Sequence, residues 1–180
     1  MQYAKNLEEH AQVITRPHKR LAGEATLLGH NYVPWRQVGR WMCIRCGQCC
    51  REFLVPLLTH EALKIYKSFG PLIVQVDGKI ALAKKPDSSC VFLSYDSGIA
   101  KCMIYFERPG VCRIYPFYVK LGASKDDDDA LYVDNMGFKY RVYIDINCPG
   151  SYKGPPIEPI MPKIIETWKK FYGWWLLSRP

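Results

Sequence analysis

The chain has 180 residues, 48% of them apolar, and a formal net charge of +8. This composition excludes a disordered tail and predicts a single folded chain with a sizeable core. No stretch approaches the roughly 20 consecutive apolar residues that a membrane-spanning helix needs. The first ten residues have no apolar run, so we expect no secretory signal and a cytoplasmic, reducing location. There, eight cysteines favour metal ligands over the alternative of a disulfide framework.

Residues 1–34 are predicted to form an N-terminal arm, with a short helix near residues 4–14. The three histidines in this arm show no ligand spacing, so we expect ordinary surface groups: His10, His18 and His30. Part of the basic excess also lies here, in Arg16, Lys19 and Arg20. A basic arm can bind nucleic acid or an acidic protein, although many proteins are basic without doing so.

Residues 35–155 are predicted to form a cysteine-rich metal-binding domain. Four of the eight cysteines lie in one short loop near its start, and they are Cys43, Cys46, Cys49 and Cys50. A thiolate at every third residue lets one tight loop aim several sulfur atoms at one point. Gly47 leaves room for the backbone to fold closely there and accepts a positive φ.

Regular elements are expected after this loop. Thr59 is the predicted N-cap of a helix that Gly70 and Pro71 end. Asp77-Gly78 predicts the turn of a first hairpin over residues 72–83. A second hairpin is expected over residues 90–105, with its turn at 96–98.

Further strands and a terminal helix are predicted after residue 110. Val111 to Tyr115 is predicted to form one helical turn, and strands are expected over residues 118–121 and 132–133. Four consecutive aspartates at 126–129 predict an exposed turn and not a calcium loop.

The longest predicted strand covers residues 138–146, where apolar residues alternate with polar ones, and Phe138 belongs to the apolar set. A proline-rich connector is expected over residues 154–159. The third predicted region, residues 156–180, packs a helix from about Met161 to Leu177 on the domain. The predicted fold is therefore α+β, a small antiparallel sheet of hairpins with a cysteine-rich metal loop and flanking helices.

The remaining cysteines are dispersed next to turns and strand ends: Cys90, Cys102, Cys112 and Cys148. Eight thiols divide into two sets of four, so one or two centres are possible. Zinc takes four thiolates in a closed tetrahedral site. A 4Fe-4S cluster also takes four, typically from a closely spaced loop and a distant cysteine. The overlapping spacing of the loop cysteines favours an iron–sulfur cluster, with zinc as the alternative.

Ordered motifs over residues 43–150 resemble one family. They are Cys43-x2-Cys46-Gly47-x-Cys49-Cys50, Cys90-x-Phe92-Leu93, Cys102-x-Ile104-Tyr105-x2-Arg108-Pro109-x2-Cys112-Arg113-x-Tyr115-Pro116-Phe117 and Cys148-Pro149-Gly150. This pattern resembles the CxxCxxCC family of zinc- or iron-chelating proteins. The resemblance implies cysteine-bound metal, often associated with iron–sulfur oxidoreductases. Flagellin lysine N-methylases carry the same cysteine pattern, but nothing else here adds methyl-transfer chemistry.

Within that pattern, Arg108 and Arg113 are candidates to offset negative charge on the sulfurs, and Tyr105 and Tyr115 to shield the centre from water. In a plainer interpretation these residues shape a turn and fill the core. No phosphate loop, serine-hydrolase elbow or dinucleotide fingerprint occurs, so an electron partner would be a protein or a diffusing cofactor. We therefore expect an iron–sulfur protein in electron transfer or redox support. The alternative is a zinc-stabilised module that binds nucleic acid or a protein assembly.

Overall fold

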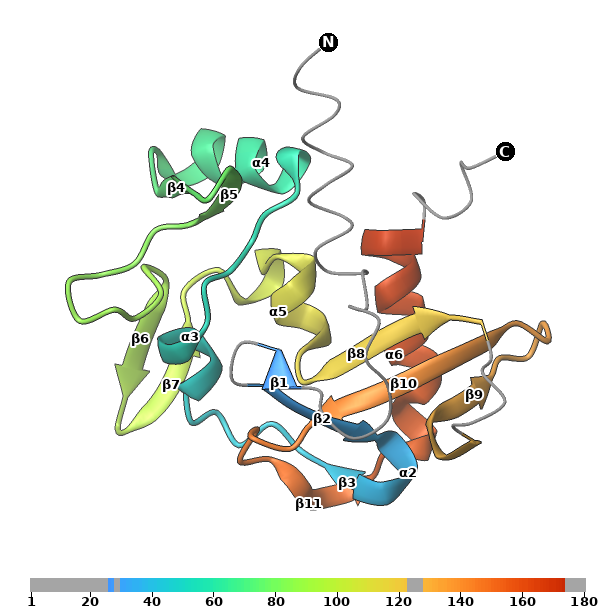
Figure 1. Cartoon of the computed structure of the whole chain (residues 1–180). Helices are drawn as coiled ribbons and strands as arrows, with labels where there is room; N and C mark the ends of the chain where they lie inside the picture. The colour runs from blue at the N-terminus through green and yellow to red at the C-terminus, as the bar shows by residue number, and fades with distance from the viewer. Residues whose placement is uncertain (1–25, 28–29, 123–127, 174–180) are drawn as a thin grey trace, which may run out of the picture. The chain divides into compact units, whose positions relative to one another are not determined.

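A computed structural model describes residues 26–27, 30–122 and 128–173 (Figure 1). The chain divides into two compact units. Among the described residues, unit 1 contains residues 45–112, and unit 2 contains those before 45 and after 112. The helix predicted near residues 4–14 lies outside the described residues. The predicted domain limits at 34 and 155 stay a prediction.

Unit 1 consists of short helices and two separate hairpins. Its elements are α3 (Gln48–Glu52), α4 (Thr59–Phe69), β4 (Ile73–Val76), β5 (Lys79–Leu82), β6 (Leu93–Asp96), β7 (Ile99–Cys102) and the start of α5 (Gly110–Ile114). Strand β4 pairs with β5, and β6 pairs with β7, both in antiparallel register. The two predicted hairpins and the helical turn that carries Cys112 are confirmed.

Local sequence explains these elements. Asp77 and Gly78 both have positive φ, as do Ser97 and Gly98, which is the geometry of a tight two-residue hairpin turn. Helix α4 ends at Gly70, as predicted, but its N-cap is Leu58 and not Thr59. The Glu61 carboxylate replaces the expected threonine cap, because it accepts a hydrogen bond from the Leu58 N–H at 2.9 Å.

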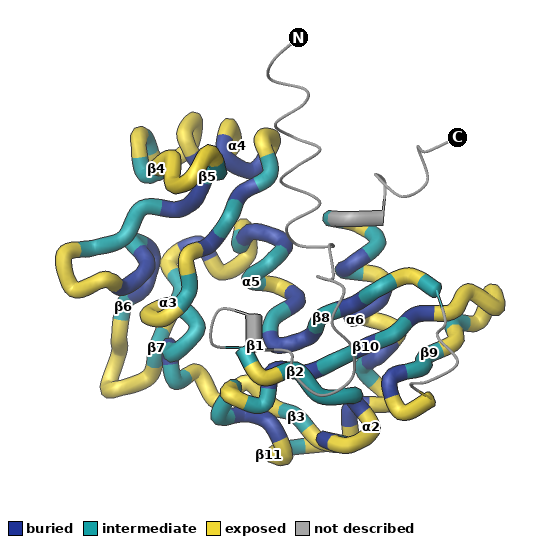
Figure 2. Tube along the Cα trace, in the orientation of Figure 1, coloured by how far each residue is buried: buried dark blue, intermediate teal, exposed yellow. Residues whose placement is uncertain are grey.

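The core of unit 1 is small and includes a cysteine. Its buried side chains are Val55, Leu57, Ala62, Ile65, Leu82, Cys90, Phe92, Leu93 and Ile104. Figure 2 shows these buried positions as short dark segments between half-buried and exposed ones. Three further cysteines are half-buried against this cluster, namely Cys50, Cys102 and Cys112. Thiols therefore occupy positions that aliphatic side chains fill in most domains of this size.

Unit 2 is built on a larger sheet. Its elements are β1 (Thr26–Leu27), β2 (His30–Pro34), α2 (Trp35–Val38), β3 (Arg40–Trp41), β8 (Phe117–Leu121), β9 (Leu131–Val133), β10 (Lys139–Asp145), β11 (Ser151–Pro156) and α6 (Met161–Trp168). The main sheet has the order β1-β2-β10-β8, and β9 also pairs with β10. All of these pairings are antiparallel, and β3 and β11 form a separate two-stranded sheet.

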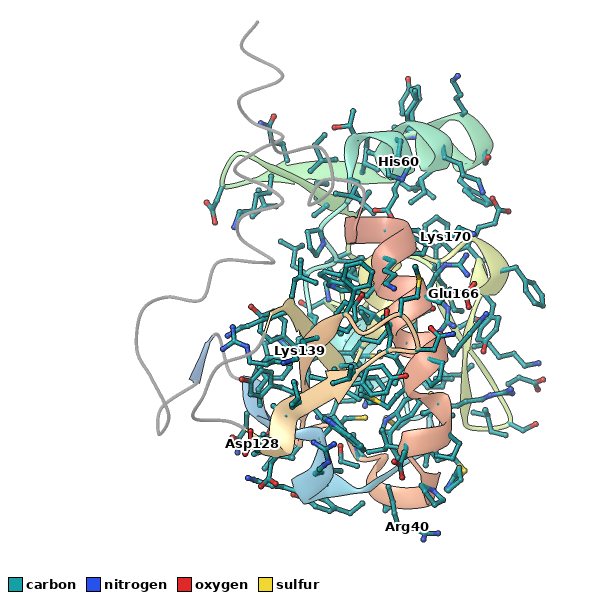
Figure 3. The ribbon with its side chains drawn as sticks, turned by 90° about the vertical axis from the view of Figure 1, so that its right-hand side faces the viewer. Arg40, His60, Asp128, Lys139, Glu166 and Lys170 are labelled. Atoms are coloured by element: carbon teal, nitrogen blue, oxygen red, sulfur yellow. The ribbon has the colours of Figure 1, made fainter. Side chains whose placement is uncertain are left out.

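Alternation along β10 places its apolar side chains on one face of the sheet. Tyr140, Val142 and Ile144 are almost fully buried. The ring of Tyr140 meets that of Trp168 edge to face at 6.0 Å between centroids, so helix α6 covers this face. In Figure 3 the sheet and helix α6 form two layers, with Lys139 of β10 on the sheet side and Glu166 of α6 on the helix side.

Some expectations for unit 2 need correction. Part of the predicted connector, residues 154–156, belongs to strand β11, whose pairing with β3 is irregular and therefore hard to foresee. Phe138 precedes β10 and is 50% exposed, and the Lys169 ammonium lies 5.6 Å from its ring centre. Helix α6 ends at Trp168 and is followed by one wider turn to Gly173. The rest of the predicted helix, residues 174–177, lies outside the described residues.

Short antiparallel sheets, hairpins and a few helices make the fold α+β, as predicted. In the part of the chain that the structure describes, no helix combines the length and the apolar character needed to cross a bilayer.

Candidate metal centre

The cysteine-rich loop rests on the β6–β7 hairpin of unit 1. The Ala100 N–H donates a hydrogen bond to the Arg45 carbonyl at 3.0 Å. The Arg51 guanidinium donates to the Tyr95 hydroxyl at 2.6 Å and to the Cys46 carbonyl at 3.3 Å. These contacts hold both ends of the loop, so the hairpin fixes its path.

Gly47 is the residue on which this path depends. Its φ is +74°, in the region that side chains rarely adopt. A Cβ built at this position would lie 2.9 Å from the Ala100 Cβ and 2.9 Å from the Tyr95 hydroxyl oxygen. The positive φ predicted for this glycine is therefore confirmed, and its close approach is to the β6–β7 hairpin, while an approach to a bound metal stays a prediction.

Four thiols from separate segments of unit 1 gather around its core. The Cys90 N–H donates to the Cys50 carbonyl at 2.7 Å, which brings α3 next to the residues before β6. Cys102 ends β7 opposite Leu93, and α5 carries Cys112. All four thiols lie close enough to affect one another electrostatically. We call Cys50, Cys90, Cys102 and Cys112 the thiol quartet.

Burial disfavours the thiolate form at three members of the quartet. It raises the pKa of Cys90, Cys102 and Cys112, with the largest effect at Cys112. The other thiols of the quartet raise the pKa of Cys112 further, and Arg108 opposes them. Thiolates here would need a nearby positive charge, which a bound metal ion supplies.

Cys50 differs from the other three. A hydrogen bond with Cys49 is the main cause that lowers the pKa of Cys50 to about 7. Burial opposes this change, while the positive charges of Arg108, Lys84 and Arg51 add to it. Arg108 is the residue that the sequence pattern indicates for this role, whereas Lys84 and Arg51 carry no such signal in the sequence. Lys84 forms an isolated bridge with Cys90, and its ammonium donates to the Arg51 carbonyl at 2.9 Å.

A buried carboxylate positions the segment that carries Cys112. Glu61 of α4 accepts from the Gly110 N–H at 2.7 Å in addition to its bond with Leu58. The side chain thereby joins the start of α4 to the start of α5. The sequence placed Glu61 in the first turn of α4, but its second partner is 49 residues away and left no local signal.

The other four predicted cysteine ligands are distributed over both units. Cys46 and Cys49 lie in unit 1 and are half-buried, while Cys43 and Cys148 belong to unit 2. In unit 2 the Met42 N–H donates to the Gly150 carbonyl at 3.2 Å, so Cys43 and Cys148 occur in adjacent backbone segments.

The other candidate residues occupy different surroundings. Arg108 stacks over the Tyr105 ring at 4.0 Å, and Tyr105 is 49% exposed. In unit 2, the Arg113 guanidinium lies 5.7 Å from the Phe171 ring centre. The Tyr115 hydroxyl lies 3.3 Å from Asp145 Oδ2. Their proposed effects on a metal centre stay predictions.

His30 is not the surface group that we expected. Its Nδ1 lies 2.6 Å from Oδ2 of Asp145, a carboxylate with no exposed surface. Asp145 also accepts from the N–H groups of Asn31 and Asn147. The two residues are 115 positions apart, so only the pairing of β2 with β10 brings them together.

All eight cysteines lie in the described residues, and none of them forms a disulfide bond there. Within that part of the chain, no three His, Cys, Asp or Glu side chains stand in a ready arrangement for a metal ion. The chemistry of the quartet nevertheless suits a thiophilic metal, because its four thiols lie in or against one apolar core with positive charge beside them.

A cysteine-rich α+β fold with thiols around a small core defines a class of metal-chelating proteins. The chain belongs to the CxxCxxCC family, described as a "putative zinc- or iron-chelating domain", whose model matches residues 42–136. It is also similar to the uncharacterized protein MJ0661 of Methanocaldococcus jannaschii, with 29% identity over 143 residues, 73% of this chain and 69% of the relative. No solved structure matches the chain.

Proposed function

We propose that the chain is an iron–sulfur protein that supports electron transfer, with the thiol quartet as the ligands of its cluster. The gathering of four thiols from four segments in one core carries this proposal. Family membership supports cysteine-bound zinc or iron. A bound cluster would supply reversible one-electron chemistry, and this chain's residues would hold it and exclude water.

The surroundings of the quartet favour a cluster. A cluster with four thiolates carries negative charge, and Arg108, Lys84 and Arg51 lie where they would offset it. Val55, Phe92 and Ile104 give the site an apolar side that keeps water out. Three of the quartet cysteines are only half-buried, which leaves the centre near the surface, as exchange of electrons with a partner requires.

Zinc is the second candidate, and the small core of unit 1 favours it. Four thiolates also satisfy zinc in a closed tetrahedral site, where the metal stabilises the fold directly. Two isolated hairpins of four-residue strands have little stability of their own, so such a contribution would be large. This candidate predicts a colourless protein.

Anaerobic purification followed by metal analysis, sulfide analysis and electron paramagnetic resonance tests the proposal. We expect a brown protein with iron and acid-labile sulfide, whose visible absorption bleaches on reduction. Cys90→Ser should lose most of the iron and colour, because Cys90 has the least exposed surface of the quartet and belongs to the core itself. Cys148→Ser in unit 2 is the matched control and should retain both.

Two outcomes would contradict the proposal. Stoichiometric zinc without iron in the anaerobic sample would favour the zinc module instead. Loss of iron on Cys148→Ser with full retention on Cys90→Ser would place the ligands outside the quartet. Circular dichroism of each variant separates loss of metal from loss of the fold.

A further inference from the structure

One face of the main sheet of unit 2 carries aromatic and basic side chains. Because Tyr140 points toward helix α6, its neighbours Arg141 and Tyr143 point to the opposite face. Strand β8 places Lys120 directly opposite Arg141 and Tyr118 directly opposite Tyr143. Figure 1 shows β8, β10 and β2 side by side. We call Tyr32, Tyr118, Lys120, Arg141 and Tyr143 the tyrosine face.

The tyrosines form a row across three strands. The ring centres of Tyr32 and Tyr118 are 5.4 Å apart, and those of Tyr118 and Tyr143 are 6.3 Å apart. All three side chains are half-buried, so part of each remains accessible. Flat rings on the face of an antiparallel sheet are a surface on which nucleic-acid bases stack.

Positive charge accompanies the rings. The Lys120 ammonium lies 5.3 Å from the Tyr118 ring centre and 5.4 Å from that of Tyr143. Lys120 and Arg141 are directly opposite on neighbouring strands, so two positive charges lie side by side on this face.

The guanidinium of Arg141 is the strongest indication that an anion binds on this face. Its Nε is buried and has no hydrogen-bond partner in the part of the chain that the structure describes. Among the described residues it makes no ion pair either. A guanidinium donates well to phosphate oxygens. A buried donor without an acceptor destabilises the fold, and a bound phosphate would supply the acceptor.

The carboxylate at the end of this face does not neutralise the charges. Asp145 is paired with Tyr32 in register, and its oxygens accept hydrogen bonds from His30, Asn31 and Asn147. Its negative charge is therefore held within the β2–β10 pair. The register pair of Arg141 and Lys120 lies four residues along β10 from Asp145.

We propose that the tyrosine face binds single-stranded nucleic acid, with bases stacked on Tyr118 and Tyr143 and phosphates bound by Lys120 and Arg141. The formal net charge of +8 agrees with a polyanionic partner. This inference concerns unit 2 and does not depend on the metal that unit 1 binds.

Fluorescence anisotropy with the full chain tests it. Labelled oligouridylate and oligothymidylate of about ten nucleotides should both bind, and about a fourfold rise in salt should weaken binding strongly. Preference for one of them distinguishes RNA from DNA. Tyr143→Ala should weaken binding at least about fivefold, while Tyr143→Phe should bind like the original chain because it keeps the ring. Arg141→Gln should weaken binding and reduce the salt dependence.

Lys153→Ala is the matched charge control, because Lys153 is exposed on β11 of the same unit. Equal losses from Lys153→Ala and Arg141→Gln would overturn the proposal, as would equal binding of polyglutamate. No binding of either oligonucleotide at low salt would also overturn it. Loss of binding only when Arg16, Lys19 and Arg20 are neutralised would assign the nucleic acid to the N-terminal arm instead. Metal content, measured on each variant, should not change.

Discussion

The cores of the two units consist of different kinds of side chain. Unit 2 packs an amphipathic helix on a five-stranded sheet, and its most buried side chains include Tyr140, Ile144 and Met161. Unit 1 has two isolated hairpins and a core cluster of nine buried apolar residues, one of them a cysteine. From this contrast we expect unit 2 to fold without a metal, and unit 1 to depend also on what its thiols bind.

Removal of metal should give the largest difference between the units. Stringent chelation under anaerobic conditions is expected to speed amide hydrogen exchange over residues 45–112 far more than over residues 128–173. The reason is that a structural thiolate site contributes on the order of 10 kcal/mol to the fold that holds it. Exchange followed by mass spectrometry checks this, and equal acceleration in both units would contradict it.

A core substitution should affect unit 2 strongly but leave metal content unchanged. Met161 of α6 has no exposed surface, so Met161→Ala should lower the free energy of unfolding by about 2–5 kcal/mol. Met136 is 74% exposed in the same unit, and Met136→Ala should change it by less than about 0.5 kcal/mol. Urea denaturation measures both, and a cost for Met161→Ala as small as that of the control would show that α6 does not pack as described.

The Asp145 carboxylate should give a smaller effect that depends on pH. Burial by itself raises the pKa of Asp145, but hydrogen bonds from His30, Asn147 and Asn31 outweigh it and lower the pKa below the ordinary value. A lowered pKa stabilises the fold above the ordinary aspartate pKa of about 4, and this stability is lost as the pH falls through the folded value.

Asp145→Asn should therefore cost about 1.5–3 kcal/mol near pH 7 and remove part of the loss seen on acidification below about pH 4. Urea denaturation at several pH values measures both effects. The exposed Asp128→Asn serves as the control and should leave the profile unchanged. An unchanged profile for Asp145→Asn would mean that its hydrogen bonds do not favour the ionised form.

Local signals in the sequence predicted most elements but few of the contacts between them. Asp77-Gly78 and Ser97-Gly98 fix their own turns, and the alternation in residues 139–145 fixes the buried face of β10. Helix α2 was not predicted because four residues carry too little periodic signal.

Long-range pairs explain what the sequence left open at the sites. The spacing of Cys43, Cys46 and Cys49 predicts a loop that aims several sulfur atoms at one point, and this stays a prediction. Local spacing did not indicate that Cys50 packs against the same core as three cysteines that follow it by 40 residues or more. Similarly, the bond between Glu61 and Gly110, and that between His30 and Asp145, depend on strand and helix packing that no local pattern encodes.

The contact between Gly47 and the β6–β7 hairpin has a consequence for protein engineering. Since any side chain at position 47 would collide with Ala100 and Tyr95, the path of the cysteine motif depends on the hairpin beneath it. A scaffold that received the eight-residue loop alone would lack the surface that shapes it. Designers who wish to move this chelating sequence should therefore graft both pieces, or expect the thiols to point in unrelated directions.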